Sequence, residues 1–145
     1  MTSPLPAVAA WESLFRAQVA VMRSLSPSFT ATELSFNEYD VLFNLSRLPH
    51  RSCRLGELQR HVLLSQPSIS RLVDRLVQRG LLAKSADPRD GRGTVVSLTD
   101  DGYRTFLEVA RVHTAAIATR LGSALNEGEL DILRQLCDRL RDQTR

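Results

Sequence analysis

The stretch of this chain that decides its fold is SQPSISRLVDRLVQRGLL, residues 65–82. Ser65 is a favourable N-cap, and Pro67 lies in the first turn of a helix, where a missing N–H group breaks no hydrogen bond. Gly80 is a typical residue at the end of a helix. The apolar residues between these positions recur at spacings of three and four, which predicts a helix over residues 65–79 with one buried face. They are Ile69, Leu72, Val73, Leu76 and Val77.

The other face of this predicted helix carries small polar residues at its beginning and arginines one and two turns later. Hydroxyl and amide groups can hydrogen-bond base edges in the major groove of DNA, and guanidinium groups can reach guanine or phosphate. The helix N-terminus also attracts phosphate. An ordinary surface helix has a similar polar face, so the helix alone leaves both interpretations open. The candidate DNA contacts on it are Ser65, Gln66, Pro67, Ser68, Ser70, Arg71 and Arg75.

A β-hairpin with a basic tip is expected directly after this helix. Residues 81–84 and 94–98 are suited to strands, and the segment 85–93 between them combines proline, glycine and aspartate. Arg89 and Arg92 lie in this connection. Such an arm can enter a minor groove, where the phosphate potential is focused. The helix and the arm together favour DNA binding over a plain surface helix.

Helices are also predicted on both sides of this segment. Three precede it, over residues 7–25, 35–48 and 54–63, and the third meets the helix at 65–79 through the tight junction of a helix-turn-helix. Two follow the hairpin. Their starts are marked by Thr99 and by a capping box of Asn126 with Glu129, and Ser35 with Glu38 forms another such box. The fold class is therefore mainly α with a small β-hairpin wing, a winged helix-turn-helix flanked by long helices.

Composition and charge agree with a nucleic-acid partner. The chain has 145 residues with a net charge of +3, yet residues 51–93 carry nine basic and four acidic residues, a net charge of +5. A solvated charged surface gives the same pattern, so charge alone does not decide the partner. No apolar run approaches the roughly 20 residues that cross a membrane, and the N-terminus lacks the pattern of a secretory signal. We therefore expect a cytoplasmic protein with no membrane partner.

The sequence contains no pattern that indicates an enzyme. It has no nucleophile with a neighbouring base, no phosphate-binding glycine loop and no paired carboxylates in a pocket pattern, so no catalytic residues and no cofactor are assigned. The histidines are scattered and the two cysteines form no CxxC pair, so no metal site is expected. A second interpretation is a winged-helix protein-interaction module whose basic face binds an acidic protein. The wing arginines and the small residues at the start of the helix argue against it.

Residues 65–82 resemble the recognition helix and first wing strand of MarR-type (multiple antibiotic resistance regulator) repressors. Helix order and length match that family over nearly the whole chain. Two positions depart from the family pattern: Leu63 stands where the turn often holds glycine, and Gln59 where a small alanine is usual. The Asp-x-Arg and Leu-Thr-x-x-Gly elements of the family's wing fall on Asp90, Arg92, Leu98, Thr99 and Gly102.

The resemblance implies one domain, residues 1–145, that forms a homodimer. Residues 1–34 and 99–145 are then the dimerisation helices, and residues 35–98 the DNA-binding lobe, with recognition helix 65–79 and wing 81–98. The resemblance implies a pseudo-palindromic double-stranded DNA operator that is read by two recognition helices roughly 34 Å apart. Repression is the usual mode of the family.

Further roles follow from the same resemblance. Asp90 is expected to pair with Arg92 and brace the wing, while Arg89 probes the minor groove. A small-molecule effector, a phenol or an aromatic carboxylate, is expected between the dimer helices and the DNA-binding lobe. The candidate effector residues are Trp11, Phe15, Arg16 and His113. A solvated Arg16 beside a dimer core of aromatic residues is the plainer alternative.

The cysteines allow a third interpretation, a redox-sensing regulator. Cys53 stands near Arg51 and Arg54, which could lower its pKa. Cys137 falls on the apolar face of the last predicted helix and is expected in the core. The first helix, where some family members carry a sensing cysteine, has none.

Overall fold

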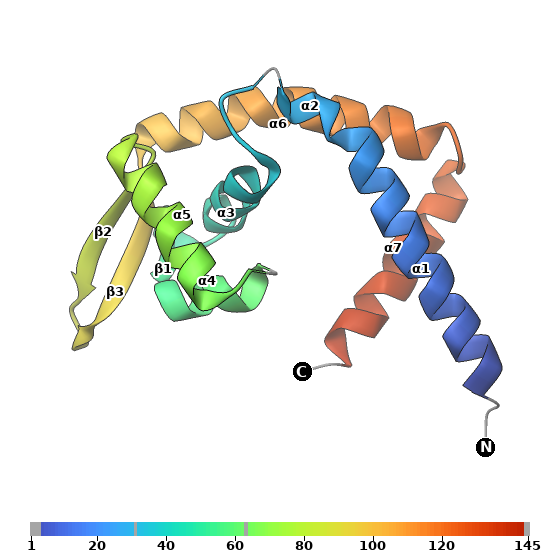
Figure 1. The fold of residues 1–145 in the computed structure, drawn as a ribbon, viewed down its shortest axis with the longest axis horizontal. Coiled ribbons are helices and arrows are strands. Elements are labelled where there is room, and N and C mark those ends of the chain that lie inside the picture. The colour runs from blue at the N-terminus through green and yellow to red at the C-terminus, as the bar shows by residue number, and fades with distance from the viewer. Residues whose placement is uncertain (1–3, 31, 63, 144–145) are drawn as a thin grey trace. The chain divides into compact units, whose positions relative to one another are not determined.

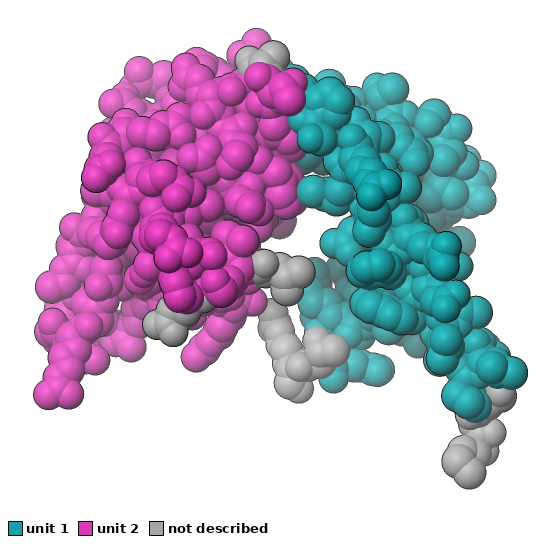
Figure 2. Space-filling view, in the orientation of Figure 1, with its two compact units in different colours: residues 1–28, 112–145 teal, residues 29–111 magenta. Residues whose placement is uncertain are grey.

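The computed structural model describes residues 4–30, 32–62 and 64–143, apart from the side chain of Gln66. The chain divides into two compact units, residues 29–111 and residues 1–28 with 112–145 (Figure 2). The elements are α1 (Pro4–Leu25), α2 (Pro27–Thr30), α3 (Phe36–Ser46), the 3-10 turn η1 (Pro49–Arg51), β1 (Ser52–Arg54), α4 (Leu55–His61), α5 (Gln66–Gln78), β2 (Leu82–Asp87), β3 (Asp90–Leu98), α6 (Asp100–Gly122) and α7 (Glu127–Asp142). Figure 1 labels the α-helices and the strands.

The helix starts that the sequence marks are confirmed. At α3 the Ser35 hydroxyl accepts the Glu38 N–H at 3.2 Å, and the Glu38 carboxylate accepts the Ser35 N–H at 2.8 Å. Asn126 and Glu129 form the same reciprocal pair at α7. Each box satisfies two backbone donors that a helix otherwise leaves unpaired. Local sequence therefore determines where these two helices begin.

The end of α5 is set by Gly80, which adopts φ +76°, the left-handed region that glycine enters without a steric penalty. The N–H groups that follow turn back onto the helix, with Leu81 donating to the Leu76 carbonyl at 3.0 Å. These hydrogen bonds end the helix and turn the chain toward β2. The predicted stop at Gly80 is thus confirmed.

The sheet differs from the expected hairpin in two ways. It has three antiparallel strands in the order β1–β3–β2, and β1, with Cys53 opposite Val96, was not predicted because three residues carry no periodicity. The hairpin strands also run further than expected, to Asp87 and Asp90, so that a short turn replaces the expected connection 85–93. The wing is therefore a firm two-stranded arm up to its tip.

Other helix boundaries also differ from the prediction, and the helix expected over residues 54–63 spans Leu55–His61. The chain does break after Leu25, but Pro27 then begins the short helix α2. The helix expected to run to residue 48 ends at Ser46, and Pro49 begins the turn η1. His50 inside this turn has φ 56°, an uncommon value for a residue with a side chain.

The core of the unit 29–111 lies between α3, α4, α5 and the sheet. It extends beyond the expected lobe 35–98 at both ends, because Phe29 precedes it and Phe106 follows it. The Tyr39 ring packs between these two rings, with centroids 5.7 and 5.3 Å away. The side chains with no more than 1% exposure in this core are Leu34, Val41, Leu42, Leu45, Leu58, Ile69, Val73, Leu76 and Val96.

The other unit is poorly buried. Leu25 is the one buried residue of the 22-residue helix α1, and the 16-residue helix α7 has none. The face of α7 expected in the core is therefore open to solvent within one chain, and Cys137 on it is only half-buried. No helix in the described part of the chain is both long and apolar enough to cross a membrane.

The junction between α5, the sheet and α6 depends on Gly102. The Thr99 hydroxyl donates to the Gly80 carbonyl at 2.7 Å and accepts the Gly102 N–H at 2.9 Å. A methyl group on Gly102 would lie 2.0 Å from the carbonyl oxygen of Leu81 and 2.8 Å from the Leu98 side chain. The backbone at this junction can therefore approach α6 only because residue 102 has no side chain.

We expect Gly102→Ala to lower the free energy of unfolding by about 3 kcal/mol, at the upper end for an overpacked site, because a backbone carbonyl cannot move aside as a side chain can. Urea unfolding measures the change. Gly56→Ala is the matched control, since a methyl group there meets nothing within 4 Å and alanine favours the helix. Equal stability of the two variants would contradict the packing described for the junction.

Candidate nucleic-acid interface

Helix α5 presents its polar face to solvent. Ile69, Val73 and Leu76 are fully buried, whereas Arg71 and Arg75 on the opposite side are exposed. Neither guanidinium group has a hydrogen bond or an ion pair within the described residues, so both are available to a ligand. The outward face that the sequence predicts for this helix is therefore present.

The beginning of α5 uses its hydroxyl groups internally. Ser65 accepts the N–H of Ser68 at 3.4 Å and donates to its hydroxyl at 2.8 Å. Ser65 and Pro67 are exposed, and Ser68 and Ser70 are half-buried. The predicted contact at Gln66 lies outside the described side chains. The small residues leave the helix N-terminus accessible to a polyanion.

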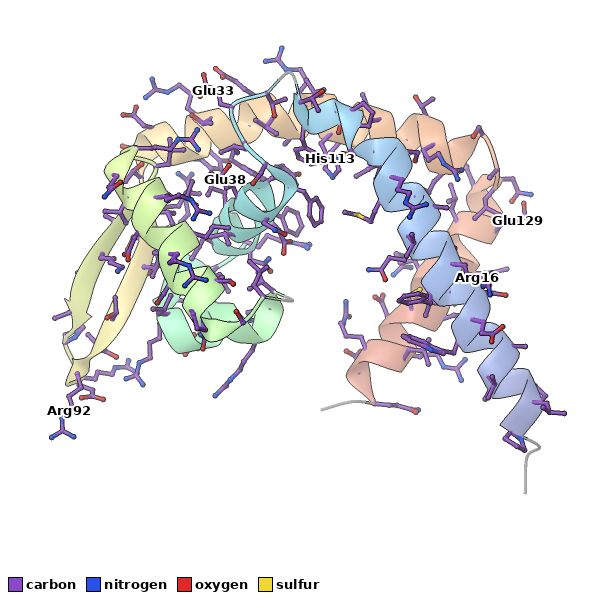
Figure 3. All side chains as sticks on the ribbon, viewed as in Figure 1. Arg16, Glu33, Glu38, Arg92, His113 and Glu129 are labelled. Carbon is purple, nitrogen blue, oxygen red and sulfur yellow. The ribbon has the colours of Figure 1, made fainter. Side chains whose placement is uncertain are left out.

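The third arginine on the polar face of α5 has a structural role that the sequence did not reveal. Arg79 donates to the Glu38 carboxylate at 3.0 Å and to the Glu33 carbonyl at 2.7 Å. Figure 3 labels Glu38 on α3 and Glu33 on the segment that leads into it. Since Glu38 also caps α3, one carboxylate joins the start of α3 to the end of α5. Arg79 therefore holds the helix in place.

A second ion pair fixes α5 to the wing. Lys84 on β2 pairs with Asp74 on the exposed side of the helix. Among the cations of α5 and β2, Arg79 and Lys84 are thus neutralised by partners within the lobe. Arg71 and Arg75 have no such partners within the described residues. The ion pairs therefore separate the cations that stabilise the lobe from those that could contact a ligand, a distinction that the sequence does not show.

The wing carries two exposed arginines at its far end. Arg89 lies in the turn and Arg92 lies on β3, where Figure 3 shows it pointing away from the lobe. Their main-chain N–H groups are held by the side chains of Asp87, at 2.9 Å, and Asp90, at 3.1 Å. These bonds fix the backbone of the tip and leave the guanidinium groups in solvent. The arrangement suits a minor groove.

The ion pair that braces the wing differs from the expected one. Asp90 holds the main chain of Arg92 and forms no ion pair with its side chain; Arg54, at the end of β1, instead pairs with Asp87. The Asp87 side chain is only 4% exposed, and Gly93 leaves room for it, since a methyl group there would lie 3.1 Å from its Cβ. The Arg89 N–H, followed by the charge of Arg54, holds the pKa of Asp87 below its usual range.

The candidate effector residues do not gather at one place within their unit. Trp11 and Phe15 are exposed on α1 with ring centroids 5.8 Å apart, and Arg16 beside them is exposed (Figure 3). His113 is buried, with its Nδ1 3.4 Å from the hydroxyl of Ser28, which lies beyond the far end of α1. Burial lowers the pKa of His113, which favours the neutral imidazole.

The environment of Cys53 is the reverse of the expected one. The thiol is buried in β1, and this burial, with a smaller effect of Glu57, raises its pKa to about 11. The guanidinium of Arg51 instead stacks 3.5 Å from the centre of the Tyr103 ring, and that of Arg54 pairs with Asp87. A buried thiol with a raised pKa is unreactive, so the redox interpretation has no support at Cys53.

Comparison with known sequences adds two findings. Residues 32–93 match the model of the MarR family. The HTH-type transcriptional regulator MhqR of Bacillus subtilis is 30% identical over 86 residues, which span 59% of this chain and 59% of that protein. The alignment thus covers less than two thirds of the relative's length.

Two solved structures extend the likeness along the chain. Sco3205 of Streptomyces coelicolor, a MarR family transcriptional regulator solved in complex with DNA, has TM-score 0.82 and 22% identity over 99% of this chain and 90% of that one. BpsR of Bordetella bronchiseptica, whose DNA binding is regulated by 6-hydroxynicotinic acid, has TM-score 0.78 and 25% identity over 90% and 91%. At 22% identity, the likeness to Sco3205 is a likeness of fold.

The brace at Asp87 predicts a pH-dependent difference in stability. Because its pKa is lowered, the carboxylate stabilises the folded lobe above the usual aspartate range, near pH ~4, and this contribution disappears as the pH falls through the lowered pKa. We expect Asp87→Asn to lower Tm at pH 7 and to match the wild type near pH ~2. Asp101→Asn, at an exposed ion pair, is the control with little effect. A Tm difference independent of pH would contradict an ionic brace.

The Cys53 thiol should be protected in the folded protein. In a Cys137→Ser variant, where it is the sole thiol, a pKa of about 11 leaves a thiolate fraction at pH 8 roughly 100-fold below that of an ordinary cysteine. Ellman's reagent should therefore react at least that much more slowly than in the same variant unfolded in urea. Equally fast reaction in both states would show that the thiol is accessible and active.

Proposed function

We propose that this chain, whose residues 32–93 match the model of the MarR family, is a member of that family and a sequence-specific, DNA-binding transcriptional regulator that acts as a homodimer and responds to a small aromatic ligand. One observation carries the proposal. The two exposed arginines of α5 that lack a partner stand on the element next to a wing whose tip bears two more. All four charges lie in the unit 29–111.

In the proposed complex α5 lies in the major groove. Its buried face leaves Arg71 and Arg75 to contact base edges or phosphates, and the small residues at its start allow the backbone to approach the floor of the groove. Arg79 is not a DNA contact in this proposal, because its guanidinium is bound to Glu38 and Glu33. It holds the end of α5 at a fixed distance from α3.

The wing reaches the adjacent minor groove. Arg89 lies in a turn whose backbone is held by hydrogen bonds to the side chains of Asp87 and Asp90. The turn therefore loses little conformational entropy on binding. Arg92 adds a second cation near the tip. Minor-groove contacts read shape and potential more than base identity. In this proposal α5 therefore reads the base sequence, whereas the wing mainly anchors the protein on the DNA.

The proposal of a homodimer is supported by the open faces of α1 and α7. In proteins, most of the stability of a helix comes from packing its apolar face against other elements. A second copy would cover these faces and supply the second recognition helix that a pseudo-palindromic operator requires. The large apolar side chains exposed on them are Leu5, Val8, Trp11, Leu14, Phe15 and Val19 on α1, and Ile132, Leu133, Leu136 and Leu140 on α7.

The proposed effector is an aromatic carboxylate or a phenol, and the proposed mode is repression that the effector releases. The regulation of BpsR by an aromatic acid supports this class of ligand. Arg16 is the candidate partner for a carboxylate, with Trp11 and Phe15 as an apolar wall. His113 is a weaker candidate, since it is buried and lies beyond the far end of α1.

Equilibrium binding to fluorescent duplexes tests the proposal. With an operator selected from a random library, Arg71→Ala or Arg75→Ala should reduce the discrimination between operator and random duplex by ~1–3 kcal/mol for each base contact that the substitution removes. Arg89→Ala should weaken binding to both duplexes by the same factor. Arg104→Ala is the control, because Arg104 is exposed in the same unit, paired only with Asp101, and on neither DNA-binding element.

If all three variants bound both duplexes as tightly as the wild type, α5 and the wing would not belong to the interface. Absence of any duplex binding by the wild type at low salt would instead point to a protein-interaction module, since DNA binding strengthens steeply as salt is lowered.

A further inference from the structure

A groove of about 400 Å³ lies between α4 and the wing strand β3, within the unit 29–111. These two elements pack beside each other. Its lining residues are Arg54, Leu55, Gly56, Glu57, Gln59, Arg60, Arg92, Gly93 and Thr94.

The groove is positively charged. Three arginines line it against one glutamate, Glu57. Arg60 is exposed and lies one helical turn after Glu57, yet it forms no ion pair within the described part of the chain. Arg54 uses its Nε on Asp87 and keeps 47% of its side chain exposed. Both guanidinium groups therefore have N–H donors to spare at the wall of the groove.

The remaining wall is suited to a polar strand. Gln59 and Thr94 add an amide and a hydroxyl group, and Gly56 leaves the backbone bare, since a methyl group on it would meet nothing within 4 Å. Gln59 is also a position where the sequence departs from the family pattern. The groove thus combines cations with neutral donors, which is the chemistry that binds a phosphodiester.

The position of the groove identifies the source of that phosphodiester. Helix α4 directly precedes α5, the helix assigned to the major groove, and β3 belongs to the wing, assigned to the minor groove. Adjacent major and minor grooves of a duplex are separated by one sugar-phosphate strand. A protein that enters both must straddle that strand. The groove is lined by the helix that immediately precedes α5 and by the strand that leads back from the wing tip, so it lies beside both parts.

We propose that the groove between α4 and β3 binds the phosphate backbone of the strand that separates the two DNA grooves, with Arg60 as the main cation and Arg54 as the second. The inference rests on the proposed function and adds a contact region to it. Arg54 then has two roles, because it braces the wing through Asp87 and faces the strand between the grooves. Arg60 has the second role alone, which makes it the residue to test.

The test measures how the affinity for a random-sequence duplex depends on salt. Each phosphate contact contributes ~0.9 to the slope of log K against log salt, so Arg60→Gln, present in both subunits of a dimer, should reduce the slope by about 2. Because a phosphate contact carries no sequence information, the affinity for a selected operator should fall by the same factor as that for the random duplex. Arg60→Lys keeps the charge and should restore most of the slope.

Arg104→Gln is the matched control, since it removes one exposed charge from the same unit outside the groove. A slope reduced by Arg60→Gln as little as by Arg104→Gln, while the wild type binds duplexes, would overturn the groove inference alone. A loss confined to the operator would also overturn it, because it would indicate a base contact. A wild type without salt-dependent duplex binding would overturn the proposed function itself. Thermal unfolding of Arg60→Gln, expected to match the wild type, verifies the fold.

Discussion

The lobe depends on one constraint, the burial of the apolar side of α5 in a core shared with α3, α4 and the sheet. Ile69, Val73 and Leu76 have no exposed surface, so α5 cannot rotate about its axis without bringing polar groups into the core. The direction in which Arg71 and Arg75 point is therefore set by hydrophobic packing on the other side of the same helix. In the proposed DNA complex, the single orientation of α5 limits the positions that these two flexible side chains can reach, which favours specific contacts.

The charged residues of the lobe fall into two groups that share one surface. Arg79, Lys84 and Arg54 are bound to Glu38, Asp74 and Asp87, and they hold α5 and the wing against the rest of the lobe. No such partner within the described residues engages the arginines assigned to the two DNA grooves, which are Arg71, Arg75, Arg89 and Arg92. This division has a physical basis, since a guanidinium engaged by a carboxylate has a reduced gain from meeting a phosphate. On α5 and at the wing tip, supports and candidate contacts can thus be told apart by their partners; Arg54, outside these two regions, combines both roles in the proposal.

Sequence predicted the elements whose signals are local. The caps at Ser35 and Asn126, the stop at Gly80 and the buried face of α5 each depend on residues within a few positions of one another. The brace between Arg54 and Asp87 could not be predicted in this way, because the two residues are 33 positions apart and meet only because β1 and β2 both pair with β3. Cys53 was misjudged for the same reason: its neighbours in sequence are arginines, but its neighbours in space are apolar.

The two units differ in how completely a single chain buries their apolar side chains. The unit 29–111 closes its own core, whereas α1 and α7 keep Trp11, Leu136 and other apolar residues exposed. In the proposed dimer this difference has a consequence for recognition. A self-contained lobe keeps its α5 and wing in register whatever happens at the dimer contact, so a ligand that acts on the dimer helices would change the separation of two intact lobes. Regulation would then act on the match to operator spacing and leave the chemistry of each half-site unchanged.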